Sequence, residues 1–222
     1  MNQRKEPADL EQEIKFFLGD ESALRRRLED LGAHPYQPRS HEINIRFDTA
    51  DGDLTRARKV LRVREAGAVI LTYKEPDPNP SPRAASAVRR LMETEITVDD
   101  LGKTVHLLHA LGFRPIARYE KFREVFRWQS VLVMIDQLPF GDFCELEGPD
   151  LADLRRAAGQ LGLEVRKALR VSYMGIFMLL KKKCHLAFPD ATFRNFSGWD
   201  ARKTVDALAA LPREGRHDPE KH

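Results

Sequence analysis

The 222-residue sequence contains only two cysteines, Cys144 and Cys184, which lie far apart and outside any CxxC motif. This scarcity argues against both a disulfide framework and a zinc ribbon. No apolar run approaches the ~20 residues that span a bilayer, and the polar N-terminus shows no signal peptide, so we expect a cytoplasmic protein. The chain also lacks GxxxxGK[ST] and GxGxxG motifs, which excludes P-loop and Rossmann chemistry as far as motifs can.

An excess of charge of one sign is also missing. Lysine and arginine number 37 against 34 aspartates and glutamates, which leaves a formal net charge of +3. This balance argues against a general polyanion binder of histone type. Together with an aromatic content of 8%, it argues against a nucleic-acid module. Hydrophobic residues make up 42%, which favours one large folded domain, or one domain with a tail.

Apolar and polar residues alternate in eight segments, which is the pattern of half-buried strands. Because short connections join most of these segments, we expect an α+β fold in which an eight-stranded antiparallel β-barrel carries flanking helices. A weak repeat, in which an acidic pair, a capped helix and long strands occur twice, also suits one closed sheet. The predicted strands cover 11–18, 41–48, 60–65, 68–75, 91–98, 116–127, 130–137 and 142–148.

Four helices are predicted where a capping side chain precedes an apolar periodicity. The chain is divided into a flexible N-terminus at 1–10, a barrel domain at 11–183 and a C-terminal extension at 184–222, whose charged end we expect to be disordered. The helix caps are Asp20, Asp99 or Asp100, Asp150 and Ser172, and the helices run over roughly 21–31, to Gly112, to Gly162 and over roughly 173–183.

Where these strands carry charge, the residues on one face mostly share one sign. Side chains alternate faces with a period of two, so like charges at i and i+2 repel by ~1 kcal/mol or more at low effective dielectric. A solvent-facing sheet surface, the ordinary alternative, usually mixes polar residues with charges of both signs. The acidic pairs are Glu11 and Glu13, Glu93 and Glu95, and Glu145 and Glu147, and the basic pairs are Arg62 and Arg64, and Lys121 and Arg123.

Like charges gathered on one face are explained if a group of opposite sign lies between the strands. Basic strands would hold a polyanion, and acidic strands would hold a divalent metal ion. A polyphosphate chelated to Mg²⁺ or Mn²⁺ needs both. The pattern therefore favours a polyphosphate site, while the solvent-facing alternative stays open for any single strand.

These residues resemble the motifs of the CYTH superfamily, the triphosphate tunnel metalloenzymes. Glu11-x-Glu13-x-Lys15 resembles the ExExK signature, which by itself is weak. Eight blocks in the family's order, over about residues 11–180, make the resemblance specific. The further blocks are Arg46-Phe47-Asp48-Thr49, Leu61-Arg62-Val63-Arg64, Leu71-Thr72-Tyr73-Lys74, Glu93-x-Glu95, Lys121-x-Arg123, Asp136 with Gly141-x-Phe143-x-Glu145-Leu146-Glu147, and Ser172-Tyr173.

The resemblance implies a tunnel inside the barrel and a role for each charged residue. Lys74 and Glu95 are implied in catalysis, Glu93 in lining the tunnel, and Arg118 as a weaker phosphate contact. The implied ligands of Mg²⁺ or Mn²⁺ are Glu11, Glu13, Asp136, Glu145 and Glu147. The implied triphosphate-binding cations are Lys15, Arg62, Arg64, Lys74, Lys121 and Arg123.

Three functions remain open from these motifs. The resemblance implies a metal-dependent hydrolase of inorganic tripolyphosphate or an organic triphosphate. Class IV adenylate cyclases share the same cation positions, and a tunnel that binds polyphosphate or nucleotide without turnover is a third alternative. The expected partner is a small-molecule triphosphate, with neither nucleic acid nor membrane, and a homodimer is left open.

Two features depart from the family's pattern. Arg46 stands where the family more often has tyrosine, which leaves the neighbouring contact undecided. Residues 76–90 hold four of the thirteen prolines, which predicts a long loop that covers a tunnel mouth and affects substrate choice.

Overall fold

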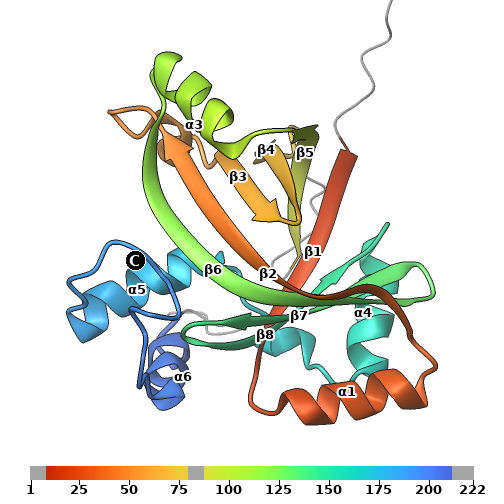
Figure 1. Ribbon diagram of the computed structural model, residues 1–222. Helices are drawn as coiled ribbons and strands as arrows, with labels where there is room; N and C mark the ends of the chain where they lie inside the picture. Colours follow the sequence, from red (N-terminus) through yellow and green to blue (C-terminus); the bar gives the residue numbers. More distant parts are fainter. Residues whose placement is uncertain (1–8, 80–87, 212–222) are drawn as a thin grey trace, which may run out of the picture.

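The computed structural model describes residues 9–79 and 88–211, in which eight antiparallel strands close into a barrel (Figure 1). Around the barrel the strands follow the order β1-β5-β4-β3-β2-β6-β7-β8, and β8 pairs with β1 to close the ring. This arrangement confirms the predicted antiparallel barrel. The strands are β1 (Asp9–Leu18), β2 (His34–Asp48), β3 (Val60–Ala66), β4 (Ala68–Pro76), β5 (Arg89–Val98), β6 (Arg114–Trp128), β7 (Val131–Leu138) and β8 (Gly141–Glu147).

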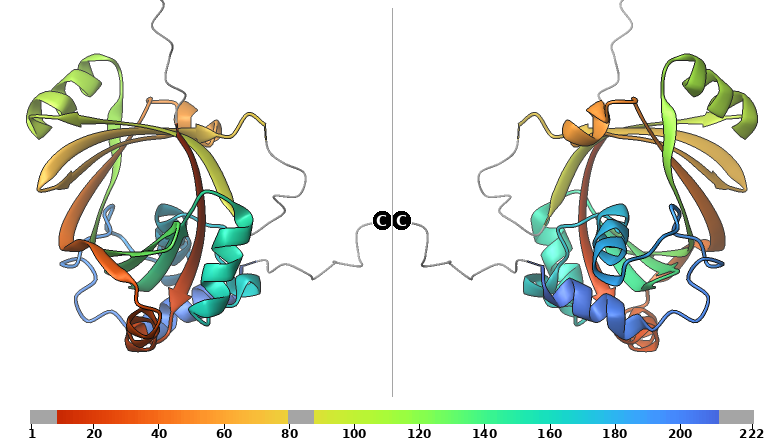
Figure 2. Two further views of the ribbon diagram at one scale, coloured as in Figure 1. Left: turned by 90° about the vertical axis from the view of Figure 1, so that its right-hand side faces the viewer. Right: turned by 90° about the vertical axis from the view of Figure 1, so that its left-hand side faces the viewer.

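The helices lie outside the ring of strands, with α3 at one end and α1, α4 and α6 gathered toward the other (Figure 2). None of the described helices is long and apolar enough to cross a bilayer. The helices are α1 (Glu21–Asp30), α2 (Asp53–Arg56), α3 (Leu101–Ala110), α4 (Leu151–Gln160), the 3-10 turn η1 (Val165–Lys167), α5 (Tyr173–Cys184) and α6 (Ala201–Ala209).

The predicted caps are confirmed. The side chains of Asp20, Asp100 and Asp150 accept backbone N–H groups in the first turns of α1, α3 and α4, and Ser172 does the same for α5. Gly32 adopts φ 65° after α1. This left-handed conformation, which side chains disfavour, ends the helix and turns the chain into β2.

Strand β2 is longer than its sequence pattern predicts, because it begins at His34 and not near residue 41. Two prolines, Pro35 and Pro38, interrupt the alternation in this segment. Register shifts against β6 occur between Pro35 and Gln37 and again between Gln37 and Ser40. Such irregularities let a strand accept prolines that a regular ladder excludes. Pairing with β6 therefore extends the strand where local sequence argues against it.

Much of the hydrophobic core lies outside the barrel, although one cluster reaches the barrel interior through Tyr119, Tyr173 and Met174. On β1 the apolar residues Ile14 and Phe16 point outward and pack with Leu24 and Leu28 of α1 and with Leu154 of α4. Because side chains alternate faces, the charged residues of the same strand point into the barrel. The helices are thus required by the strands, since they bury the apolar face that would otherwise meet water.

The core continues through the C-terminal segment without a break at residue 183. Helices α5 and α6 share one hydrophobic cluster with Phe140 and Phe143 of the barrel, and Phe196 lies within it. Helix α6 is not among the sequence-predicted helices, because its buried positions, Ala207 and Leu208, give a weak apolar signal. The charged end expected to be disordered falls largely in residues 212–222, which lie outside the described residues.

The predicted proline-rich loop is described only at its two ends. Strand β4 ends at Pro76 and β5 begins at Arg89. Residues 80–87 lie outside the described residues, so the role expected for this loop stays a prediction.

Substitution of Phe196 tests whether the C-terminal segment is part of the folded core. Its ring is 5% exposed and contacts the rings of Phe140, Phe177, Phe188 and Trp199. We expect Phe196→Ala to lower the free energy of unfolding by about 3–5 kcal/mol in urea denaturation. Met178→Ala, at an exposed position of α5, should change it by less than about 0.5 kcal/mol. Equal unfolding midpoints for the two variants would contradict the packing described.

Candidate functional site

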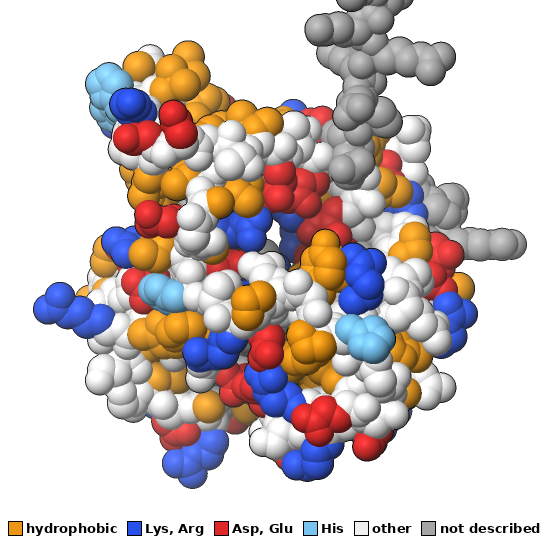
Figure 3. Space-filling view, turned by 45° about the vertical axis from the view of Figure 1, so that its right-hand side comes forward, with side chains coloured by type: hydrophobic (Ala, Val, Ile, Leu, Met, Phe, Trp, Pro, Cys, Tyr) orange, Lys and Arg blue, Asp and Glu red, His pale blue; other side chains and the backbone are white. Residues whose placement is uncertain are grey.

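Charged side chains line a cavity of about 790 Å³ in the interior of the barrel. Lysine and arginine supply twelve of these side chains and glutamate supplies seven, a formal excess of five, although Lys59, Arg90 and Lys121 also pair with Glu75, Asp77 and Asp136, which are not among the lining residues. Figure 3 shows acidic and basic side chains gathered around an opening into the molecule. An interior of this kind attracts a polyanion, because its low-dielectric walls strengthen the field of the cations.

The structure brings together all but two of the residues that the sequence nominated. The exceptions are Asp136, which is fully buried and is not among the cavity-lining residues, and Arg118, which is half-exposed and pairs with Glu120 at 3.6 Å. The nominated residues that line the cavity are Glu11, Glu13, Lys15, Arg62, Arg64, Lys74, Glu93, Glu95, Lys121, Arg123, Glu145 and Glu147.

Strands β1, β6, β7 and β8 supply one wall, in which Glu145 of β8 lies between Lys15 of β1 and Arg123 of β6. Glu145 accepts a hydrogen bond from each of these cations. Although burial opposes ionisation, these cations hold the pKa of Glu145 well below its ordinary value. The pairing follows from register, because Lys15 and Glu145 are partners across β1 and β8.

Asp136 is fully buried and accepts hydrogen bonds from residues of the same wall. It accepts hydrogen bonds from Lys121 at 3.2 Å, from Arg123 Nε at 2.6 Å and from the Tyr173 hydroxyl at 2.7 Å. Its observed role is to position two cations that face the cavity. The metal-ligand role implied by the resemblance stays a prediction for this residue.

On the opposite wall, Lys74 of β4 lies between two carboxylates. Its amine is 2.6 Å from Glu11 and 3.0 Å from Glu93. Burial, together with the nearby carboxylates of Glu11 and Glu95, raises the pKa of Glu93 to about 7. Glu93 can therefore exchange a proton near neutral pH.

Glu95 differs from its neighbour Glu93 in protonation. The Thr72 hydroxyl donates to Glu95 at 2.7 Å, and Arg62 and Arg64 lie 3.5 and 3.6 Å from it. Burial alone would raise the pKa of Glu95, but these donors and cations hold it below its ordinary value. Two adjacent carboxylates with separated pKa values can divide acid and base roles between them.

The glutamates have the donor chemistry that Mg²⁺ and Mn²⁺ require. Glu13 and Glu147 are partners across β1 and β8, and Glu11 shares their cavity. Burial and the neighbouring Glu11 and Glu13 carboxylates raise the pKa of Glu147, for which no ion pair occurs among the described residues. A divalent cation could neutralise closely spaced carboxylates of this kind. As the side chains stand in the described residues, no three acidic, histidine or cysteine groups lie close enough to form a metal centre.

Sequence reasoning missed several residues of the cavity, among them Glu42, Arg46, Arg89 and Tyr119. Glu42 is 1% exposed and joins two walls, because it lies 3.3 Å from Arg64 and 3.4 Å from Lys121. The alternation of faces could have identified Glu42, because it lies four positions before Arg46 in the same strand and therefore on the same face. Arg89 was missed because the pattern placed the start of its strand at residue 91.

Arg46 extends the row of cations in the cavity. It is the cross-strand partner of Arg62, and its Nε atom has no hydrogen-bond partner among the described residues. Burial, together with Arg62 and Arg89, lowers the pKa of Arg46. The departure from the usual tyrosine thus places a further guanidinium where an anion can reach it.

The comparisons with known proteins agree with this geometry. The CYTH domain family model matches residues 9–164. The chain belongs to the CYTH family. In sequence it is 28% identical over 167 residues to a Methanocaldococcus jannaschii protein named "Putative adenylate cyclase", a match that covers 73% of this chain and 91% of the relative.

Solved structures show the same fold. A Vibrio parahaemolyticus protein with the same description as that relative superimposes with a TM-score of 0.64 at 21% identity, over 77% of this chain and 99% of that one. The PH1012 protein of Pyrococcus horikoshii superimposes with a TM-score of 0.62 at 24% identity, over 74% of this chain and 97% of that one. A Hippeastrum protein superimposes with a TM-score of 0.57 at 22% identity, over 76% of this chain and 95% of that one. It is described as an adenylyl cyclase candidate with a dominant triphosphatase activity.

The buried carboxylate of Glu42 predicts a specific loss of stability in acid. Its pKa is lowered from 4.5 to about 2, since Lys121, Arg123 and Arg64 outweigh the effect of burial. A lowered pKa in the folded state stabilises the protein above pH 4.5, and this contribution is lost as pH falls toward 2. Relative to Glu42→Gln, the wild type should lose about 2 kcal/mol of unfolding free energy between pH 6 and pH 3.

Urea denaturation of both proteins across this pH range measures the difference. Glu65→Gln, at an exposed position of the neighbouring strand β3, serves as the control and should show no such trend. A constant difference between wild type and Glu42→Gln at every pH would show that Glu42 titrates normally.

Proposed function

We propose that this protein binds a linear triphosphate inside the barrel and hydrolyses its terminal phosphoanhydride bond with the help of Mg²⁺ or Mn²⁺. The observation that carries the proposal is the formal excess of five cations in a cavity that also holds seven glutamates. A phosphate group carries roughly one to two negative charges near neutral pH, so a triphosphate suits a cavity in which cations outnumber carboxylates. A site for a neutral substrate would not need it.

The cations of the cavity are already held in place before an anion arrives. Arg62 and Arg64 share Glu95, and Lys15 and Arg123 share Glu145, so each guanidinium or amine has a defined position. Guanidinium groups bind phosphate through paired hydrogen bonds, and each amine adds a point charge. We infer that phosphate oxygens replace part of the carboxylate contacts when the substrate binds.

Glu11, Glu13, Glu145 and Glu147 are the residues that would hold the metal ion, with Asp136 implied as a further ligand. When bound, the ion would neutralise negative charge on the phosphoryl oxygens of the triphosphate. The chain's own groups would complete the site. In this proposal Lys74 binds the phosphate that is transferred, Glu95 stays ionised and orients water, and Glu93 accepts a proton from that water near pH 7.

Adenylate cyclase chemistry is the second candidate, and the names of the relatives favour it. The same cations would bind the triphosphate of ATP, but the ribose hydroxyl would attack the α-phosphorus and pyrophosphate would leave. The Hippeastrum relative, in which triphosphatase activity is described as dominant, supports placing hydrolysis first.

Product analysis separates these functions. The purified protein is given tripolyphosphate, ATP or thiamine triphosphate with Mg²⁺ or Mn²⁺, and orthophosphate, pyrophosphate and cyclic AMP are quantified. Orthophosphate release supports the hydrolase, and the fastest substrate identifies its class. Cyclic AMP with pyrophosphate would instead establish the cyclase. Binding of substrate without any product would leave a tunnel that binds polyphosphate and does not turn it over.

Glu147→Gln tests the carboxylate set, because it removes a charge without breaking an ion pair of the described residues. We expect the rate of phosphate release with Mg²⁺ to fall by about a hundredfold or more, as for loss of a transition-state charge contact. Glu65→Gln, outside the barrel, should keep the wild-type rate. A Glu147→Gln variant with normal turnover would remove this residue from the metal site.

Arg62→Ala tests the cation row. Its guanidinium lies inside the barrel, 3.4 Å from the Tyr119 hydroxyl and 3.3 Å from Thr72. Since charge on the triphosphate grows at the transferred end, we expect KM to rise and kcat to fall together, with kcat/KM reduced by at least about a hundredfold. Arg114→Ala, exposed at the start of β6, is the matched control. An unchanged kcat/KM in Arg62→Ala would place Arg62 outside the substrate site.

A further inference from the structure

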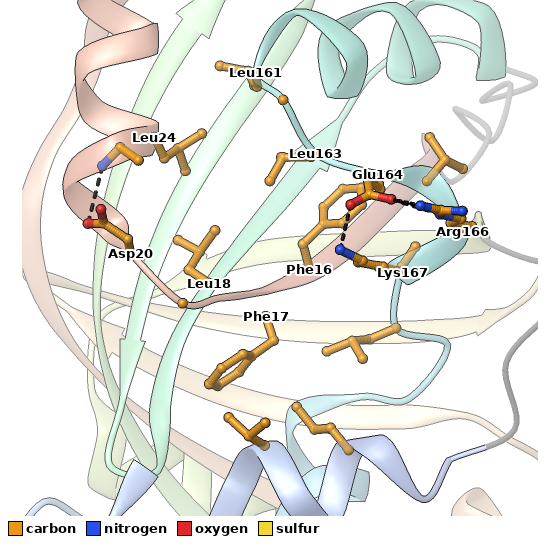
Figure 4. A pocket seen from close by; sticks show the side chains of 18 of the residues that line it. Phe16, Phe17, Leu18, Asp20, Leu24, Leu161, Leu163, Glu164, Arg166 and Lys167 are labelled. Atoms are coloured by element: carbon orange, nitrogen blue, oxygen red, sulfur yellow. Dashed lines mark hydrogen bonds and ion pairs between the residues drawn. The ribbon is translucent and has the colours of Figure 1, made fainter. Parts of the chain in front are cut away.

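A second cavity, of about 840 Å³, lies outside the barrel and is as large as the charged one. It is enclosed by the end of β1, by α1, by residues 161–171 and by α6. Figure 4 shows the apolar side chains that point into it from these elements. Among them are Phe16, Phe17, Leu18, Leu24, Leu161 and Leu163.

One wall of this cavity comes from sequence beyond the CYTH match. The family model ends at residue 164, whereas Val205, Leu208 and Leu211 line the cavity from α6 and the residues after it. Val205 remains 47% exposed, so the added wall leaves apolar surface uncovered. The C-terminal segment thus builds a concave apolar site against the barrel. Cavities of this size with apolar walls and few polar groups are typical of small-molecule sites.

The polar groups around the cavity are mainly basic. Arg27, Arg166, Lys167 and Arg170 line it, and the acidic side chains among its described lining residues are Asp20 and Glu164. Both acids are already engaged in local contacts: Asp20 accepts the N–H groups of Ser22 and Ala23, and Glu164 pairs with Arg166 and Lys167.

Arg27 differs from the other cations of this cavity. Its guanidinium makes no ion pair or hydrogen bond with the described residues. It lies against Gly162, where a Cβ atom would come within 2.7 Å of the guanidinium carbon. The absence of a side chain at Gly162 therefore leaves room for the exposed guanidinium of Arg27 at the rim of the apolar cavity. An apolar ligand with one negative charge would satisfy both the cavity and this cation.

We propose that this cavity binds a small amphipathic carboxylate, whose hydrocarbon chain fills the space between β1 and α6 and whose carboxylate pairs with Arg27. A free phosphate ion would leave the apolar walls in contact with water. A neutral hydrocarbon would leave the charge of Arg27 unused. A medium-chain acyl carboxylate has both a hydrocarbon chain that fits the apolar walls and a negative charge that pairs with Arg27.

The cavity shares a wall with the charged interior of the barrel. Arg170 and Val171 line both cavities, and the preceding Leu169 donates its N–H to the carbonyl of Lys15 at 2.7 Å. The hydroxyl of Tyr173, which follows Val171 by two residues, donates a hydrogen bond to Asp136. A ligand that shifts residues 169–171 would therefore act on cations of the barrel. This expected effect on turnover rests on the proposed function, whereas binding of the carboxylate does not.

Calorimetric titration of the full-length protein with decanoate, kept below its micellar concentration, tests the proposal. We expect saturable binding at one site. Arg27→Ala should weaken decanoate binding by about fivefold and leave decanol binding unchanged. Arg26→Ala, on the same helix but outside the cavity, should behave as the wild type. Absence of saturable binding, or equal effects of Arg27→Ala on decanoate and decanol, would overturn the proposed ligand class.

A cavity-filling variant locates the site independently. Ala23 lines the cavity and its neighbour Ser22 does not, so Ala23→Trp should abolish decanoate binding while Ser22→Trp preserves it. Thermal melts of both variants show whether they fold. If Ala23→Trp does not fold, the Arg27→Ala titration still tests the site. Binding that survives in folded Ala23→Trp would refute the location. A wild-type dimer that Ala23→Trp dissociates, with no decanoate binding to either protein, would assign the cavity to a second copy.

Phosphate release from tripolyphosphate is then measured with and without decanoate. A change of rate in the wild type but not in Ala23→Trp would support coupling between the cavities. Decanoate binding in a protein without any triphosphate turnover would reject the proposed function and leave the second site standing.

Discussion

The structure depends on one constraint, which is that the strands carry their charges on the face that closes inward. Once the ring closes, each described strand pairs with a neighbour on both sides along part of its length, and the charged side chains of the inward face are confined to the interior. The apolar face is then left outside, where only helices and the C-terminal segment can bury it. The hydrophobic core therefore packs largely around the barrel, and one part of it, at Tyr119, Tyr173 and Met174, reaches the interior.

Confinement of so many charges requires compensation between the strands. Glu42, Glu95 and Glu145 each lie between two cations, and they come from three different strands. Buried ion pairs of this kind add little net stability, because desolvation offsets their attraction. Their evident effect is to fix the positions of the cations. The interior is thus an arrangement ready to exchange carboxylate contacts for those of a polyanion.

The C-terminal segment packs against the barrel and forms part of a second cavity. It covers apolar surface through Phe196 and Leu208, and it also leaves a cavity where α6 meets β1. The short segment at residues 169–171 lies between this cavity and the charged interior. Two chemically opposite spaces, one apolar and one highly charged, therefore adjoin across a single stretch of chain.

The sequence by itself determined the strand alternation, the helix caps and the set of charges that face inward, because each depends on local periodicity. It could not show that Asp136 pairs with Lys121 and Arg123, that Glu42 joins two walls, or that Pro35 is accepted within β2. Those features depend on register between strands far apart in sequence, which only the closed barrel fixes. Helix α6 and its cavity were likewise decided by tertiary packing, since small residues such as Ala207 become core residues only when a partner surface is present.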